Sequence, residues 1–185
     1  MRQSEIQFIR NQGFTAAHPD HRLYVALMFQ PRTIAGVTAL GLVLQSGWLF
    51  VALSAVVWWG TVFPSRNLFD ATYNRLIAYP RGLPPIPVAP APRRFAQVMA
   101  ATVTLTIGAA LLSGATATAW FFEGLFAIAL MAVVLGRVCA PANLYLRLTG
   151  AGDPGASVPR RVMAVGRDPS AGARRLRRGR VVALR

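Results

Sequence analysis

The stretch TIAGVTALGLVLQSGWLFVALSAVVWWGTVF, residues 33–63, decides the fold class of this chain because it contains no charged side chain. A transmembrane helix needs about 20 apolar residues, so this stretch is long for one crossing and short for two. Gln45-Ser46-Gly47 interrupts it with residues that favour a turn. The stretch therefore predicts a hairpin of two helices, one from about Arg22 to Gln45 and one from about Trp48 to Phe63.

A second apolar block, residues 95–138, repeats this pattern after a polar connector. Ser113-Gly114 divides it, and its only charged residues are Glu123 and Arg137. The two halves predict helices over Phe95–Leu112 and Thr116–Val138, both long enough to cross a bilayer. The expected fold class is therefore an all-α integral membrane protein with four transmembrane helices arranged as two helical hairpins.

The remaining segments are polar and frame the two hairpins. We expect a polar N-terminal segment over 1–21, a first hairpin over 22–63 and a second over 95–148. The connector over 64–94 ends in a proline-rich half typical of an extended, stiff spacer. The tail over 149–185 is rich in Gly, Pro, Ser and Arg, so alone in water it should be disordered.

The charge distribution predicts the topology. The chain carries 20 basic residues, all of them arginine, and six acidic ones, giving a net charge of +14, although its mean hydropathy is +0.43. No arginine occurs in the predicted hairpin tips around 45–48 and 113–116. Because arginine concentrates on the cytoplasmic side of membranes, we expect both termini to be cytoplasmic. The expected location is the bacterial cytoplasmic (inner) membrane, crossed several times.

The tail needs an anionic partner, and the sequence favours a lipid surface or an acidic protein face over nucleic acid. No nucleic-acid-binding fold precedes the tail, and no aromatic residues interleave its arginines. The predicted contacts to anionic phospholipids or partner proteins are the following arginines: Arg160, Arg161, Arg174, Arg175, Arg177, Arg178, Arg180 and Arg185.

A glutamate, two histidines and a cysteine are further candidates for functional residues. Glu123 lies about two turns from the second hairpin tip, which favours the membrane interface or a subunit contact over proton transfer. His18 and His21 are spaced for a metal site but lack further ligands, so surface positions flanking an N-cap at Asp20 are favoured. Cys139 follows the last predicted helix, where the helix dipole raises a thiol pKa, which favours a structural role.

Small residues predict close helix packing. Gly36, Gly41 and Gly108 lie within the predicted helices, and we expect them to pack against helices of partner subunits.

Several motifs resemble a bacterial four-helix membrane family known as domain of unknown function 4395. They are LQSGWLFVAL (44–53), RRFAQVMA (93–100) with its Phe95-Ala96-Gln97, and Gly136-Arg137-Val138-Cys139. The resemblance covers about residues 20–148 and implies a four-helix membrane fold without an assigned activity. The family typically has a second cysteine where this chain has Ala142, so thiol-pair chemistry does not carry over.

Together these features predict a non-catalytic accessory or assembly subunit of a larger membrane complex, such as a photosynthetic or respiratory one. We find no nucleotide-binding loop, catalytic triad or carboxylate pair, so we do not expect an enzyme. The expected partners are other membrane protein subunits and anionic phospholipids, with no cofactor of its own and pigment or haem contact only through partners. The alternative is a small transporter or a thiol/redox membrane protein that uses Glu123 or Cys139.

Overall fold

The computed structural model describes residues 2–14 and 20–150, and every element in this part of the chain is a helix. Three helices are long and apolar enough to cross a membrane. They are α2 (His21–Leu44), α5 (Ala91–Leu112) and α6 (Thr116–Val134). The apolar helix α3 (Gly47–Val62) has 16 residues, which corresponds to roughly 24 Å at 1.5 Å per residue, against a hydrocarbon core of about 30 Å.

Shorter helices complete the described unit. They are α1 (Gln3–Asn11), η1 (Pro64–Arg66), α4 (Leu68–Tyr73), η2 (Asn74–Ala78), η3 (Tyr79–Arg81) and α7 (Ala140–Thr149). Neither α1 nor α7 was predicted from the sequence.

Local side chains set the ends of α2 and α3. Asp20 caps α2, since its carboxylate accepts a hydrogen bond from the backbone N–H of Arg22 at 3.3 Å. Gln45 ends the same helix in the left-handed conformation, with φ 45°. Ser46 then caps α3 by accepting from the N–H of Leu49. The predicted turn is therefore where the chain reverses.

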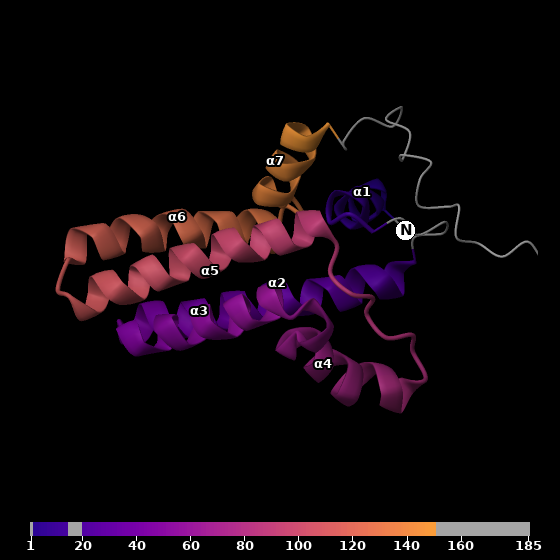
Figure 1. Cartoon of the computed structure of the whole chain (residues 1–185), viewed down its shortest axis with the longest axis horizontal. Coiled ribbons are helices and arrows are strands. Elements are labelled where there is room, and N and C mark those ends of the chain that lie inside the picture. The colour runs from indigo at the N-terminus through magenta and orange to yellow at the C-terminus, as the bar shows by residue number, and fades with distance from the viewer. Residues whose placement is uncertain (1, 15–19, 151–185) are drawn as a thin grey trace, which may run out of the picture. The chain divides into compact units, whose positions relative to one another are not determined.

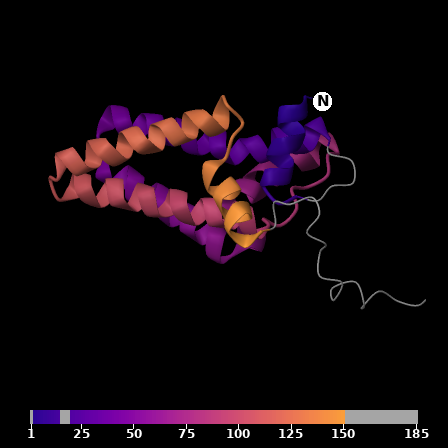
Figure 2. The ribbon, with the colours of Figure 1, turned by 90° about the horizontal axis from the view of Figure 1, so that it is seen from above.

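The four long helices run lengthwise beside one another, whereas α1, α4 and α7 gather at one end (Figure 1). The turn between α5 and α6 lies at the opposite end, and the view from above shows the same separation (Figure 2). The turn between α2 and α3 also lies at that opposite end, because Gly47 at the start of α3 contacts Gly108 near the end of α5. Both turns thus face away from the connector and from α7.

Helices α3 and α5 approach closely through two glycines. A Cβ atom on Gly108 would lie 2.9 Å from the carbonyl oxygen of Gly47 and 2.8 Å from Cγ2 of Val51. Two turns further along, the buried hydroxyl of Ser54 donates to the carbonyl of Ala101 at 2.7 Å. In an apolar environment a short interhelical hydrogen bond and close backbone packing both favour association.

Two predicted helix boundaries were wrong. Helix α6 ends at Val134 rather than Val138, because Arg137 adopts a left-handed conformation with φ 58° that a continuing helix does not permit. Helix α5 begins at Ala91 rather than Phe95, since Pro92 lies in its first turn, where a missing N–H costs nothing.

The glycine contact gives a testable prediction on the stability of the isolated protein. Gly108→Ala should lower the free energy of unfolding by roughly 1–3 kcal/mol, because the added methyl group meets backbone atoms that cannot yield. Gly36→Ala is the matched control in α2, since a Cβ there meets no atom within 4 Å. Unfolding in mixed detergent micelles, followed by tryptophan fluorescence, measures both. Equal stability of the two variants would contradict the close α3–α5 contact.

Candidate functional site

A largely apolar cavity of about 470 Å³ lies between the long helices and α7. It is lined by side chains of α2, α3, α5, α6 and α7, among them Leu27, Ile34, Val57, Val103, Phe126, Ala129, Val133 and Leu144. Polar side chains contribute to one part of its wall, namely Gln12, Gln30, Arg93, Gln97 and Cys139. The cavity is thus an apolar space with a small polar end, a form typical of sites for apolar or amphipathic molecules.

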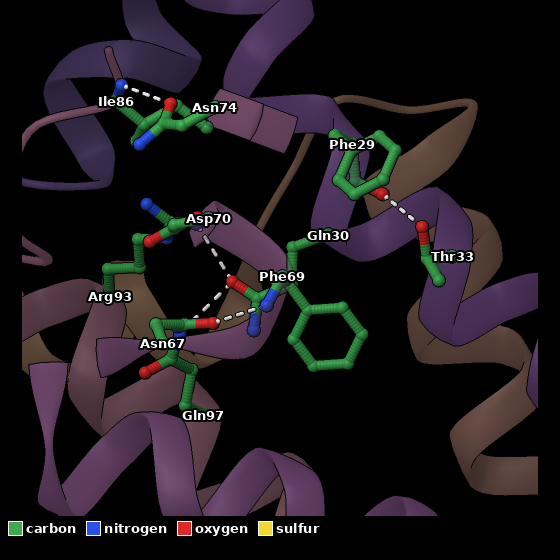
Figure 3. A network of polar contacts seen from close by, with 10 residues as sticks. All are labelled: Phe29, Gln30, Thr33, Asn67, Phe69, Asp70, Asn74, Ile86, Arg93 and Gln97. Atoms are coloured by element: carbon green, nitrogen blue, oxygen red, sulfur yellow. Dashed lines mark hydrogen bonds and ion pairs between the residues drawn. The ribbon is translucent and has the colours of Figure 1, made fainter. Parts of the chain in front are cut away.

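The polar wall is held by a buried ion pair (Figure 3). Arg93, near the start of α5, donates through Nη2 to Oδ1 of Asp70 at 2.7 Å and to Oε1 of Gln30 at 2.8 Å. Gln97 donates to the same oxygen of Gln30 at 3.0 Å. These residues come from α5, α4 and α2, and all four are buried. The network therefore ties the connector to two of the long helices.

This network is electrically balanced but does not use all its polar atoms. The carboxylate of Asp70 neutralises the guanidinium of Arg93 at 2.7 Å, so the polar end of the cavity carries no net charge. Within the described residues, Nη1 of Arg93 and Oε1 of Gln97 have no hydrogen-bond partner although both are buried. An unpaired buried polar atom is costly, so this wall favours a neutral polar group over an anion.

Asn74 fixes the start of the proline-rich part of the connector. Its Oδ1 accepts a hydrogen bond from the backbone N–H of Ile86 at 2.9 Å (Figure 3). The connector is thereby anchored to η2 between the ion pair and the beginning of α5.

The sequence placed Cys139 at the end of the last apolar helix. In the structure it lies in the cavity wall instead. It is the N-cap residue of α7, beyond the turn at Arg137. Burial raises the pKa of the Cys139 thiol, and this outweighs hydrogen bonds from the backbone of Ala142 and the side chain of Gln12 that lower it. The pKa of Cys139 is raised, as predicted from the sequence, but burial causes the shift and not a helix dipole. A buried, protonated thiol is a weak nucleophile.

Glu5 links α1 to the beginning of α2 and to the turn after α6. Its Oε2 lies 3.2 Å from Nδ1 of His21, and its Oε1 lies 3.8 Å from Nη1 of Arg137. Burial pushes the pKa of Glu5 upward, but the hydrogen bonds from His21 and the Arg2 backbone and the charge of Arg137 outweigh it, so the pKa is lowered. The carboxylate therefore stays ionised at neutral pH.

Arg137 is held in place by the same cluster. Its guanidinium lies 5.5 Å from the centre of the Tyr24 ring, and its Nη1 donates to the hydroxyl of Ser4 at 2.9 Å. His21 therefore takes part in this tie between helices, while its expected neighbour His18 lies outside the described residues.

Glu123 is buried in α6 and has a partner within the chain. Nε2 of Gln45 lies 3.4 Å from both carboxylate oxygens, so the end of α2 is tied to α6. The residue lies near the two turns, as expected from its distance to Ser113-Gly114.

The three glycines singled out in the sequence have different surroundings. A Cβ on Gly41 would lie 2.9 Å from the Phe50 ring, and one on Gly108 would meet α3. A Cβ on Gly36 would meet no atom within 4 Å, so of these three glycines Gly36 alone has no close neighbour among the described residues.

The arginines predicted to contact lipid or partners, Arg160 to Arg185, lie outside the described residues. Within residues 2–14 and 20–150 there is no group of three or more His, Cys, Asp or Glu that could hold a metal ion. The sequence analysis missed the network of Arg93, Asp70, Gln30 and Gln97. The one signal available was Asp70, the only acidic residue in a connector rich in arginine.

Long apolar helices around a buried ion pair indicate a helical membrane protein as the class of this chain. A family model described as "Domain of unknown function (DUF4395)" matches residues 26–149, which is more than half of the chain. The chain therefore belongs to this family, which confirms the resemblance drawn from Phe95-Ala96-Gln97 and its neighbours. Comparisons with curated proteins and with solved structures found no match.

The ion pair gives a second prediction. Asp70→Asn should lower the free energy of unfolding by roughly 3–5 kcal/mol, because the Arg93 guanidinium is left buried without a counter-charge. Arg94→Gln, at the exposed neighbouring position, should leave stability nearly unchanged. The double variant Arg93→Met/Asp70→Asn should be more stable than Asp70→Asn alone, since it removes the uncompensated charge. Denaturation in mixed micelles measures the free energy of unfolding of each variant. If the double variant is less stable than Asp70→Asn alone, Arg93 and Asp70 do not stabilise each other as proposed.

Proposed function

We propose that this chain is a non-catalytic subunit of a larger membrane protein complex, which it stabilises by helix packing. The observation that carries the proposal is the cavity beside α6, because it makes the helix bundle incomplete on its own. The cavity is largely apolar and open at the surface of the bundle, so in a membrane its walls contact either lipid chains or a helix of another subunit. A helix of another subunit is the occupant that this proposal assigns to it.

The outer face of α6 supports a partner as the occupant. Only Ala119, Glu123 and Phe126 of this helix are buried, and several of its large apolar side chains are exposed. The exposed set includes Trp120, Phe121, Leu125, Ile128 and Met131. A Cβ on Gly124 in the same helix would meet no atom within 4 Å, so a neighbouring helix can approach closely there.

The internal bonding of the two candidate reactive residues supports a structural role. Glu123 is held by Gln45, and Cys139 is buried with a raised pKa. Transport through Glu123 or redox chemistry at Cys139 would need these groups to reach a substrate. The partners we propose are other membrane protein subunits, in a photosynthetic or respiratory complex, and anionic phospholipids.

The topology we propose has four crossings, with both termini on the cytoplasmic side of a bacterial inner membrane. The placement of both turns at the end away from the connector supports it, since the connector and α7 carry arginine and the turns carry none. In this topology α3 is the shortest crossing. Its 16 residues include Trp48 at one end and Trp59 near the other, where aromatic side chains favour the membrane interfaces.

Filling the cavity tests the subunit role. Ala129→Phe places a ring in the cavity wall and should reduce the co-purifying partner at least severalfold, because the partner can no longer enter. Leu105→Phe is the matched control, since Leu105 is exposed on α5, does not line the cavity and does not belong to the outer face of α6. Native gels of mild detergent extracts, with subunits identified by mass spectrometry, measure the partner. A wild-type protein that migrates alone, without stoichiometric subunits, would contradict the proposal.

Cysteine labelling in intact cells tests the topology. Ser46→Cys and Ala115→Cys, one in each turn, should react with a membrane-impermeant maleimide added outside. Arg75→Cys in the connector should react only after permeabilisation. Cys139 can stay in place because it is buried. Labelling of Arg75→Cys in intact cells would show that the connector is exported and that the four-crossing topology is wrong.

A further inference from the structure

A second cavity, of about 530 Å³, lies on the opposite side of α2 from α6, between α2 and the connector. We call it the basic groove, and define it by Arg22 and Arg32 of α2, Arg81 of η3, and the apolar side chains Phe29, Ile77 and Leu83. Three guanidinium groups thus surround an apolar floor, and no carboxylate lines the groove. This combination is absent from the first cavity, where Asp70 neutralises the arginine.

The groove arginines have no internal counter-charge. Within residues 2–14 and 20–150, the side chains of Arg22, Arg32 and Arg81 form no hydrogen bond or ion pair, whereas Arg93 and Arg137 both do. The acidic residues nearby are already engaged elsewhere. Glu5 faces His21 at the groove rim, and Asp70 is held by Arg93.

Asp20 is the remaining described carboxylate near α2, and it caps the helix by accepting from the N–H of Arg22. Arg22, Arg32 and Arg81 are exposed, and no carboxylate lines the groove to pair with them. An external anion can therefore pair with these arginines without displacing a partner inside the described chain.

The apolar floor restricts what kind of anion fits. The Phe29 and Tyr73 rings lie 5.5 Å apart at the base of the groove, and Ile77 and Leu83 extend the apolar surface. A small inorganic anion would leave this surface in contact with water. A molecule with both an anionic head and a hydrocarbon part covers the floor and neutralises the arginines together.

The position of the groove indicates where such a molecule comes from. Arg32 is the last charged residue before the charge-free stretch 33–63. If α2 crosses the membrane as proposed above, on which this inference rests, the groove runs along the cytoplasmic part of this helix, from Arg22 near its start to Arg32 ten residues further on. Basic pockets beside the cytoplasmic ends of transmembrane helices bind anionic lipid headgroups.

We propose that the basic groove is a binding site for the phosphate-bearing headgroup of an anionic phospholipid, with its first acyl carbons on the apolar floor. Arginine donors match phosphate oxygens in pairs. Arg22 and Arg32 lie ten residues apart on α2, about 15 Å along the helix, so one phosphate is held at one end of the groove and not by all three arginines together. The groove has one wall from α2 and one from the connector. A bound lipid that contacts both walls would therefore stabilise the packing of the connector on α2.

Lipid titration of the purified full-length chain tests the proposal. Phosphatidylglycerol, phosphatidylcholine and inorganic phosphate are titrated separately, and bound molecules are counted by native mass spectrometry. The groove variant is Arg22→Gln/Arg32→Gln/Arg81→Gln. The control Arg66→Gln/Arg75→Gln/Arg94→Gln removes the same charge from exposed arginines that do not line the groove. Lipid held by the tail is common to all three proteins and cancels in the comparison.

We expect the first phosphatidylglycerol to bind about 100-fold more weakly to the groove variant, and within about twofold of wild type to the control. Equal weakening in both variants would mean diffuse charge attraction and would overturn the site. Binding of inorganic phosphate that depends on the three groove arginines, without a preference for phosphatidylglycerol, would overturn the lipid assignment. The titration needs no partner subunit, so loss of the complex in the Ala129→Phe experiment leaves this result unaffected.

Discussion

The ion pair between Arg93 and Asp70 is the interaction on which the arrangement of the helices depends. It joins α5 to α4, and through Gln30 it also reaches α2, all in a region closed to water. Neither charge is stable there alone, because an unpaired buried charge costs several kcal/mol. The connector must therefore fold back onto the start of α5, and this folding places Tyr73, Ile77, Arg81 and Leu83 beside α2, where they line the second cavity.

The apolar helices were predictable from the sequence because their signals are local. The absence of charge over 33–63, the turn residues at Gln45-Ser46 and the cap at Asp20 act within a few residues of the chain, and the structure places helix ends where these signals predict. What could not be predicted depends on residues far apart. Helix α1 is stabilised by packing of Phe8 on Tyr24 and by Glu5 on His21 and Arg137, contacts that no periodic pattern reveals.

The candidate sites divide in the same way. The position of Glu123 two turns from the second hairpin tip could be read from the sequence, but its burial could not. The raised pKa of the Cys139 thiol was predicted from a helix dipole, whereas burial causes it. The partner of Glu123 is Gln45, 78 positions away, and Cys139 begins a helix because of an unusual backbone conformation at Arg137. The Arg93 network and the basic groove combine residues from α2, the connector and α5. Such combinations exist only once the chain is folded.

The burial of most carboxylates in the described fold affects the self-association of this protein. Glu5, Asp70 and Glu123 are all buried, so Asp20 is the exposed carboxylate among the described residues, whereas several described arginines are exposed, among them Arg22, Arg32 and Arg81. The exposed charge of the described fold is therefore mainly positive at the end that carries α1, α4 and α7. Two copies brought together by these ends would repel one another, more strongly at low ionic strength. Self-association through this end is therefore disfavoured, and a molecule that carries negative charge of its own has the advantage there.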